Sequence, residues 1–142
     1  MRKLVREKNL ERHIEVESAG TAGWHAGSPP DRRSHAAAAR RGIALESVAQ
    51  QFTAGSFARF SLVLAADAQN RRDLESIAPD AEARAKIRLL RDFDSRAERG
   101  ASVPDPYYGG PNGFEEVLDI CEAACRGLLE QLERQLDGTV DP

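Results

Sequence analysis

A run of seven mostly apolar residues at positions 60–66, FSLVLAA, is followed at once by Asp67 and a polar stretch. The run is too short to cross a bilayer, and its continuous apolar character is typical of a strand buried on both faces of a sheet. Sheets of that kind are built from parallel strands joined through helices. Residues 60–66 therefore predict a strand followed by a helix, and they favour an α/β fold.

The rest of the chain supplies the alternation of strands and helices that such a fold requires. The last predicted helix is the clearest element, because its apolar residues recur at spacings of three and four. At the other end, Leu4, Val5 and Leu10 lie among charged residues and indicate that the chain begins within an amphipathic helix. The predicted strands lie at 14–18, 60–65 and 85–90, and the predicted helices at 36–41, 67–77 and 114–136.

Composition narrows the possible classes of function. The 142 residues amount to one domain, and 41% hydrophobic with 30% charged residues is ordinary for a globular protein. The net charge of −3 argues against a broad nucleic-acid surface, whose affinity would come from basic residues. No apolar run approaches the length of a membrane span, and no apolar core of a signal peptide follows Met1. We therefore expect a cytoplasmic protein.

Both tyrosines of the chain, Tyr107 and Tyr108, stand together in the stretch VPDPYYGG at 103–110. Asp105 lies between two prolines, and the proline after it restricts its backbone to an extended conformation. A carboxyl group held stiffly beside two aromatic rings suits a general acid that acts on an aromatic substrate. The same pattern also fits a turn in which the two tyrosines cover the core. Composition alone leaves both interpretations open.

The order of several motifs resembles that of the low-molecular-weight protein-tyrosine-phosphatase family. The sequence DPYYG before a long terminal helix resembles the general-acid loop of that family, and RKLV at 2–5 resembles the end of its first helix. The resemblance runs from residue 2 to residue 132 and rests on the order and spacing of all the pieces. The other matching pieces are SAGT at 18–21, GWH at 23–25, Gly27, Pro30, Asp31, RRGI at 40–43, AQQF at 49–52, LVLAAD at 62–67 and Asn70.

The resemblance implies a two-step phosphoryl transfer. In that family a cysteine thiolate attacks the phosphorus and an aspartic acid protonates the leaving tyrosyl oxygen; the same residue then activates water to hydrolyse the phosphocysteine. A tyrosine hydroxyl has a pKa of about 10, so a positioned acid helps it to leave. By resemblance, Asp105 is the general acid and base, Trp24, Tyr107 and Tyr108 bind the phosphotyrosine ring, and Ser18 supports the phosphate loop.

The phosphate loop of that family, with the pattern C-x5-R-S, does not occur in these 142 residues. In the family its backbone N–H groups hold the phosphate and its cysteine is the nucleophile. The two cysteines of this chain, Cys121 and Cys125, lie on the apolar face of the last predicted helix and have the wrong spacing to Arg126. We interpret them as core residues. We therefore expect the chain as it stands to be inactive.

The resemblance also implies the fold. It is the three-layer, parallel-sheet α/β fold of the type I phosphotyrosine phosphatases, with strand order 2-1-3-4. The first strand, which is central in that order, would precede Met1. We therefore expect a single domain over residues 1–142 that is incomplete at its N-terminus. Arg41 stands where many members of the family have a histidine.

The expected partner is a phosphotyrosine-containing protein or a small aryl phosphate, with no nucleic acid and no membrane. We expect no cofactor, and the three histidines have no shared metal-ligand spacing. Unpaired strand edges would leave room for self-association. Two other classes stay open: a catalytically inactive phosphatase-like binding module, and a relative of the arsenate reductases. The second is disfavoured because no pair of cysteines lies between residues 67 and 104.

Overall fold

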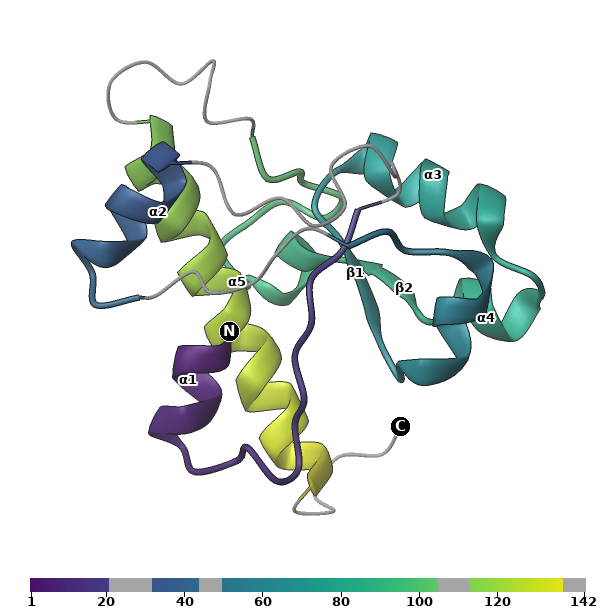
Figure 1. Ribbon diagram of the computed structural model, residues 1–142, viewed down its shortest axis with the longest axis horizontal. Helices are drawn as coiled ribbons and strands as arrows, with labels where there is room; N and C mark the ends of the chain where they lie inside the picture. The colour runs from purple at the N-terminus through teal and green to yellow at the C-terminus, as the bar shows by residue number, and fades with distance from the viewer. Residues whose placement is uncertain (21–31, 44–49, 105–112, 137–142) are drawn as a thin grey trace.

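The computed structural model describes residues 1–20, 32–43, 50–104 and 113–136 (Figure 1). Within them, the sheet consists of strands β1 (Val63–Ala65) and β2 (Ile87–Leu89). The two strands pair in parallel, with Val63 opposite Ile87 and Ala65 opposite Leu89. The parallel pairing predicted from the apolar run is confirmed, although both strands are shorter than predicted.

The two helices between β1 and β2 begin at side-chain caps. The helix α3 (Ala68–Ile77) starts after Asp67, whose carboxylate accepts a hydrogen bond from the N–H of Asn70 at 2.7 Å. The short helix α4 (Ala81–Ala85) starts in the same way after Asp80. An acceptor at this position satisfies a backbone donor that has no partner within the helix. The prediction of a helix from Asp67 to about residue 77 is confirmed.

One set of buried apolar side chains packs between the sheet and the helices α3 and α4. It includes residues from the 3-10 helix η1 (Ala54–Arg59) and from the segment before it. The rings of Phe52 and Phe57 meet edge to face, with 4.9 Å between their centroids. We call this set the sheet core; its buried members are Phe52, Phe57, Val63, Ala65, Leu74, Ala78, Ala83, Ile87 and Leu89.

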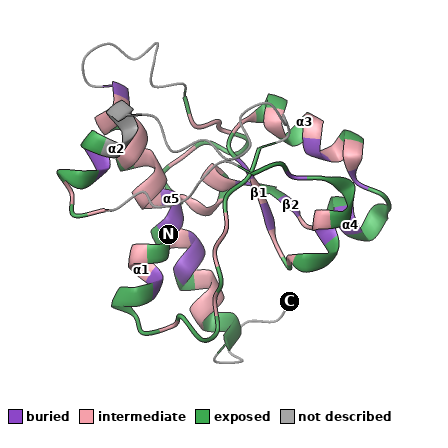
Figure 2. Cartoon of the chain, viewed as in Figure 1, coloured by how far each residue is buried: buried purple, intermediate pink, exposed green. Residues whose placement is uncertain are grey.

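A second group of helices lies beside the sheet region in Figure 1. The long helix α5 (Gly113–Leu136) confirms the amphipathic helix predicted over 114–136, and it contacts both α1 (Arg2–Glu7) and α2 (Arg32–Ala39). Figure 2 shows buried positions along α5 where these helices meet. We call this group the helix side; its buried residues are Val5, Ala37, Ala38, Gly113, Ala124, Cys125, Leu128 and Leu129.

The two regions are joined through the 3-10 helix η2 (Leu90–Phe93), which follows β2 and packs against α5. The contact is close at Gly127 of α5: a Cβ atom at this position would overlap the carbonyl oxygen of Phe93 and lie 3.0 Å from its carbonyl carbon. Only glycine lets the two backbones approach this closely. In the described part of the chain, no helix combines the length and the apolar character needed to cross a membrane.

The strand predicted over 14–18 is not formed, and this prediction is wrong. Ile14 and Val16 are half-buried and Glu15 is exposed, so the alternation that suggested the strand is present in the burial. A strand also requires a neighbour, and within the described residues this segment has no strand partner. The nearby pairing is a single parallel bridge between Gly20 and Gln51.

Gly42 lies in the turn that follows α2. This residue has a φ of +72°, a left-handed conformation that glycine adopts without strain. The helix itself covers 32–39 rather than the predicted 36–41.

Candidate active site

Four of the five predicted site residues, Asp105, Trp24, Tyr107 and Tyr108, lie outside the described residues. Ser18 is the fifth, and it is exposed. The structure therefore shows one predicted site residue directly. For the other four, it shows the described residues that lie next to them in the sequence.

The segment that contains Ser18 is attached to the sheet core. The carbonyl oxygen of Ser18 accepts a hydrogen bond from the side-chain amide of Gln50 at 2.8 Å. Two residues on, the N–H of Gly20 donates to the carbonyl of Gln50 at 2.9 Å, and the carbonyl of Gly20 accepts from the N–H of Phe52 at 2.7 Å. Because Phe52 belongs to the sheet core, these hydrogen bonds hold residues 18–20 against that core.

The carboxyl end of β1 leads into α3 through a hydrogen-bonded turn. The side-chain oxygen of Asn70 accepts from the N–H of Ala66 at 3.1 Å, while the N–H of Asn70 donates to Asp67. Ligands of open parallel sheets bind at the carboxyl ends of the strands. These hydrogen bonds thus fix the turn at the carboxyl end of the sheet, where a ligand site is expected.

The segment that leads to Asp105 is tied to the same turn. The N–H of Val103 donates to the carbonyl of Ala66 at 2.7 Å. The hydroxyl of Ser102 accepts from the N–H of Ala68, the first residue of α3, at 3.2 Å. The chain therefore passes the carboxyl end of β1 two residues before Asp105. Residues 102 and 103 thus lie at the carboxyl end of β1, where the candidate site is expected.

Neither cysteine of the chain has the properties of a nucleophile. Cys125 is buried, and Cys121 is half-buried on the same helix. Burial raises the pKa of the Cys121 thiol to about 11, with a smaller contribution from Cys125. A thiol with this pKa is protonated near neutral pH, whereas the thiolate is the reactive form. The structure agrees with the interpretation of both residues as packing residues.

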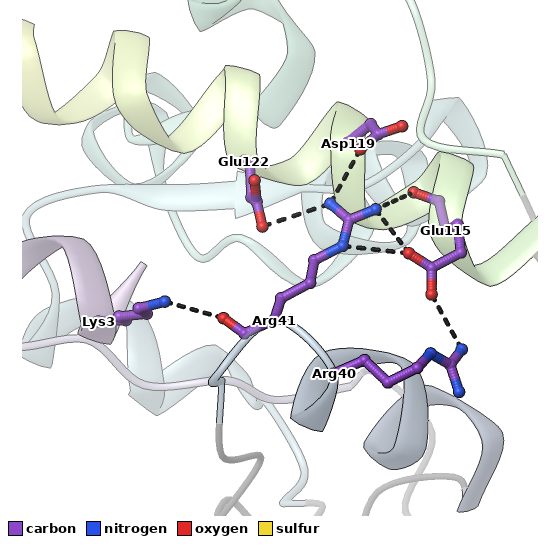
Figure 3. Close-up of polar contacts among 6 residues, drawn as sticks. All are labelled: Lys3, Arg40, Arg41, Glu115, Asp119 and Glu122. Carbon is purple, nitrogen blue, oxygen red and sulfur yellow. Dashed lines mark hydrogen bonds and ion pairs between the residues drawn. The ribbon is translucent and has the colours of Figure 1, made fainter.

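The strongest ionic cluster of the described residues joins α2 to α5 and centres on Arg41 (Figure 3). The Arg41 guanidinium donates to the Glu115 carboxylate from Nη2 at 2.7 Å and from Nε at 3.1 Å. Its Nη1 atom lies 2.9 Å from Asp119 and 3.4 Å from Glu122. The three carboxylates follow each other at spacings of four and three residues, so they share one face of α5.

Two further cations complete this cluster, which we call the Arg41 cluster. Arg40 donates to the second carboxylate oxygen of Glu115 at 2.9 Å, and the Lys3 ammonium donates to the backbone carbonyl of Arg41 at 2.9 Å. The hydrogen bonds from Arg41 and then Arg40 lower the pKa of Glu115, and the bond to Glu115 is the main cause that raises the pKa of Arg41. The cluster thereby links α1, the end of α2 and the start of α5.

The Arg41 cluster was not predicted from the sequence. There, Arg41 stands out only because many members of the family that the sequence resembles have a histidine at this position. The acidic stripe at 115, 119 and 122 is visible in the sequence as a helical pattern, but its partner lies 74 positions away from Glu115. Among the residues that the structure describes, no three His, Cys, Asp or Glu side chains form a group that could hold a metal ion.

Comparison with known proteins gives consistent results. Residues 1–138 match the family described as low molecular weight phosphotyrosine protein phosphatase. A low molecular weight protein-tyrosine-phosphatase from Streptomyces coelicolor is 44% identical, and the alignment covers 94% of this chain and 82% of that protein. The low molecular weight phosphotyrosine protein phosphatase of Homo sapiens is 38% identical, with 92% and 82% covered.

A solved structure supports the same assignment. The crystal structure of a protein tyrosine phosphatase from Entamoeba histolytica, with Hepes in its active site, superposes with a TM-score of 0.87 at 32% identity. The superposition covers 94% of this chain and 85% of that one. The extent of these matches leads to one conclusion: the chain belongs to the low-molecular-weight protein-tyrosine-phosphatase family.

Proposed function

We propose that the function of this chain is the hydrolysis of phosphotyrosine through a phosphocysteine intermediate, with Asp105 as the general acid and base. The observation that carries the proposal is the DPYYG sequence at 105–109. Val103, two residues before Asp105, is hydrogen-bonded at the carboxyl end of β1. Membership of the family supports the reaction class. The residue roles rest on the sequence.

The proposed reaction has two steps. In the first, a cysteine thiolate attacks the phosphorus, the bond from phosphorus to the tyrosyl oxygen breaks, and the Asp105 carboxylic acid gives its proton to that oxygen. In the second, the Asp105 carboxylate takes a proton from a water molecule that attacks the phosphocysteine, which releases phosphate and restores the thiolate. Proton transfer by a positioned side chain contributes about 10²–10⁴-fold to rates of this kind.

The aromatic residues Trp24, Tyr107 and Tyr108 would contact the ring of the substrate, and Ser18 would support the phosphate-binding backbone. Ring contacts contribute on the order of 0.5–1.5 kcal/mol each. The substrate is then a phosphotyrosine-containing protein or a small aryl phosphate, met in the cytoplasm. Substitution of Trp24 or Tyr107 by alanine should mainly raise KM for aryl phosphates.

The thiolate for the first step is not supplied by the 142 residues. They contain no C-x5-R-S sequence, and the two cysteines on α5 have the burial described above. Turnover requires a segment that carries this sequence, so that backbone N–H groups and an arginine can hold the phosphate beside the thiolate. We expect the 142 residues alone to be inactive.

The experiment compares three proteins with an aryl phosphate as substrate: the 142-residue chain, the chain with a C-x5-R-S segment from a family member joined before Met1, and the same fusion with the cysteine of that segment replaced by serine. Turnover that vanadate inhibits is expected only from the second. Turnover or a covalent phosphoenzyme on the 142-residue chain would contradict the assigned nucleophile. A folded but inactive second protein would contradict the proposed function.

We further propose that the unpaired edges of the sheet promote self-association of the 142-residue chain. Within the described residues, β1 pairs only with β2, and an edge strand presents unpaired backbone groups to other chains. Sedimentation at several concentrations should show a mass that rises with concentration. A monomer at all concentrations would contradict this proposal.

A further inference from the structure

The two residues before Pro104 are held from two sides. On the side of β1 and α3, the backbone N–H of Val103 and the hydroxyl of Ser102 form the hydrogen bonds to Ala66 and Ala68 described above. On the side of η2, the Nη1 atom of Arg91 donates to the backbone carbonyl of Ser102 at 2.8 Å. Ser102 is therefore fixed through its carbonyl and its hydroxyl together.

We propose that Arg91 is a positioning residue for Asp105, acting through the carbonyl of Ser102. The inference rests on the proposed role of Asp105 as general acid. A general acid must stand within hydrogen-bonding reach of the leaving oxygen, and a displacement of about 1 Å lowers the rate by roughly a hundredfold. Asp105 is only three residues beyond Ser102, so fixing Ser102 limits where the acid can go.

Arg91 can do this because its own backbone is fixed. It belongs to η2, which packs against α5, and the glycine contact between Gly127 and the carbonyl of Phe93 sets the separation of the two. The contact thus connects α5, through η2 and Arg91, to the segment before the acid. Rigid secondary structure of this kind supports precise placement better than a loop alone.

The guanidinium of Arg91 also carries a cost that a surface arginine would not. Its Nε atom is buried, and no hydrogen-bond acceptor for it lies among the described residues. A buried donor without a partner is unfavourable, whereas an arginine turned to solvent would avoid that cost. The side chain is nevertheless held in the position from which Nη1 reaches Ser102. The side chain thus fixes the position of residues 102–104 although its buried Nε atom lowers the stability of the fold.

Arg88 offers a matched control close by in the sequence. Its guanidinium lies over the ring of Phe93, 5.0 Å from the centroid, and Arg88 is exposed. No hydrogen bond connects it to residues 101–104 within the described structure. Arg88→Met therefore removes an arginine next to η2 without touching the contact at Ser102.

The first measurement is hydrogen exchange by NMR on the 142-residue chain. The amide of Val103 reports the contact, and the amide of Ala78, bonded to Leu74 in α3 at 3.0 Å, reports general stability. Arg91→Met should raise the exchange rate of Val103 by about tenfold relative to Ala78, because a charge-assisted hydrogen bond to the same segment is lost. Arg91→Lys should recover part of the protection, and Arg88→Met should change neither amide.

The second measurement uses the fusion that carries the C-x5-R-S segment. Arg91→Met should lower kcat/KM for phenyl phosphate more than kcat/KM for p-nitrophenyl phosphate, since only the poorer leaving group needs a well-placed proton donor in the first step. Unchanged exchange at Val103, or a rise matched by Ala78, would overturn the inference, and so would an unchanged ratio of the two kcat/KM values. If the fusion is inactive with every substrate, the proposed function fails, while exchange at Val103 still decides whether Arg91 holds the segment.

Discussion

The sheet core and the helix side of this molecule are stabilised by different interactions. The sheet core is built from large apolar side chains, and Phe57 at its centre is only 2% exposed. On the helix side, α2 meets α5 through small buried alanines, and the Arg41 cluster lies at the same junction. The contribution of buried apolar surface involves no ionisable group and is not weakened by screening ions, whereas that of surface ion pairs depends on pH and falls as salt is added.

This difference indicates which part of the molecule responds to pH and salt. Acid or salt should loosen the junction of α1, α2 and α5 before it affects the packing of β1, β2, α3 and α4. The segment that leads to Asp105 is bonded to both regions, to β1 and α3 on one side and through η2 to α5 on the other. Its placement therefore depends on the packing of both regions.

Removal of Phe57 should have the largest effect. Phe57→Ala deletes a ring that packs against Phe52, and it should lower the free energy of unfolding by about 3–5 kcal/mol. Denaturant unfolding measures the loss, and Phe57→Leu, which retains most of the volume, should lose less. Equal losses in the two variants, or a loss below about 1 kcal/mol for alanine, would show that the sheet core is not packed as described.

A methyl group at the contact between the two regions should have the next largest effect. Gly127→Ala places a Cβ atom against the carbonyl of Phe93 and should destabilise the protein by about 1–3 kcal/mol, because backbone atoms on both sides have to move. Gly55→Ala is the control, since a Cβ atom there would meet only the Thr53 hydroxyl at 4.0 Å. A neutral Gly127→Ala would mean that η2 and α5 are free to separate.

Disruption of the Arg41 cluster should have the smallest effect on stability at neutral pH, and that effect should depend on pH. The pKa of Glu115 is lowered in the folded protein, so its contribution is present above the unfolded pKa of about 4.3. That contribution is lost as the pH falls through the folded pKa. Arg41→Met should thus lower Tm at pH 7 and in low salt, and the difference from the unsubstituted chain should shrink in acid and in high salt.

The control for this prediction lies in the sheet region. Arg71 pairs with Glu75 on the exposed face of α3 at 3.4 Å, and such pairs contribute little. Arg71→Met should leave Tm and its pH dependence close to those of the unsubstituted chain. If both variants show the same pH dependence, the Arg41 cluster has no special role in holding the helix side.

Local sequence patterns predicted the elements whose cause is local. Asp67, which caps α3, accepts its hydrogen bond from a residue only three positions later. The apolar spacing that predicts α5 likewise lies within one continuous segment. The strand at 14–18 failed because its formation depends on a neighbour that the local pattern does not contain. The Arg41 cluster was missed for the same reason, because Arg41 and Glu115 meet only through the packing of α2 on α5.

The candidate site divides in the same way. Asp105, Trp24, Tyr107 and Tyr108 could be named because a short motif and its order along the chain indicate their roles, and those roles stay predictions. The contacts that hold the approach to Asp105 could not be named. Arg91 and Ser102 lie in no motif, and their hydrogen bond, like that between Val103 and Ala66, joins segments that only the fold brings together.

The role of Asp105 as proton donor is tested most directly by its leaving-group dependence. In the fusion that carries the C-x5-R-S segment, Asp105→Asn should lower kcat/KM for phenyl phosphate by about 10²–10⁴-fold. The ratio kcat/KM reports the first step, in which the leaving oxygen is protonated, and excludes hydrolysis of the phosphocysteine, which is common to all substrates. The loss should be much smaller for p-nitrophenyl phosphate, whose leaving group departs without a proton. Equal losses on the two substrates, with the variant still folded, would contradict the role and leave Asp105 as a structural residue.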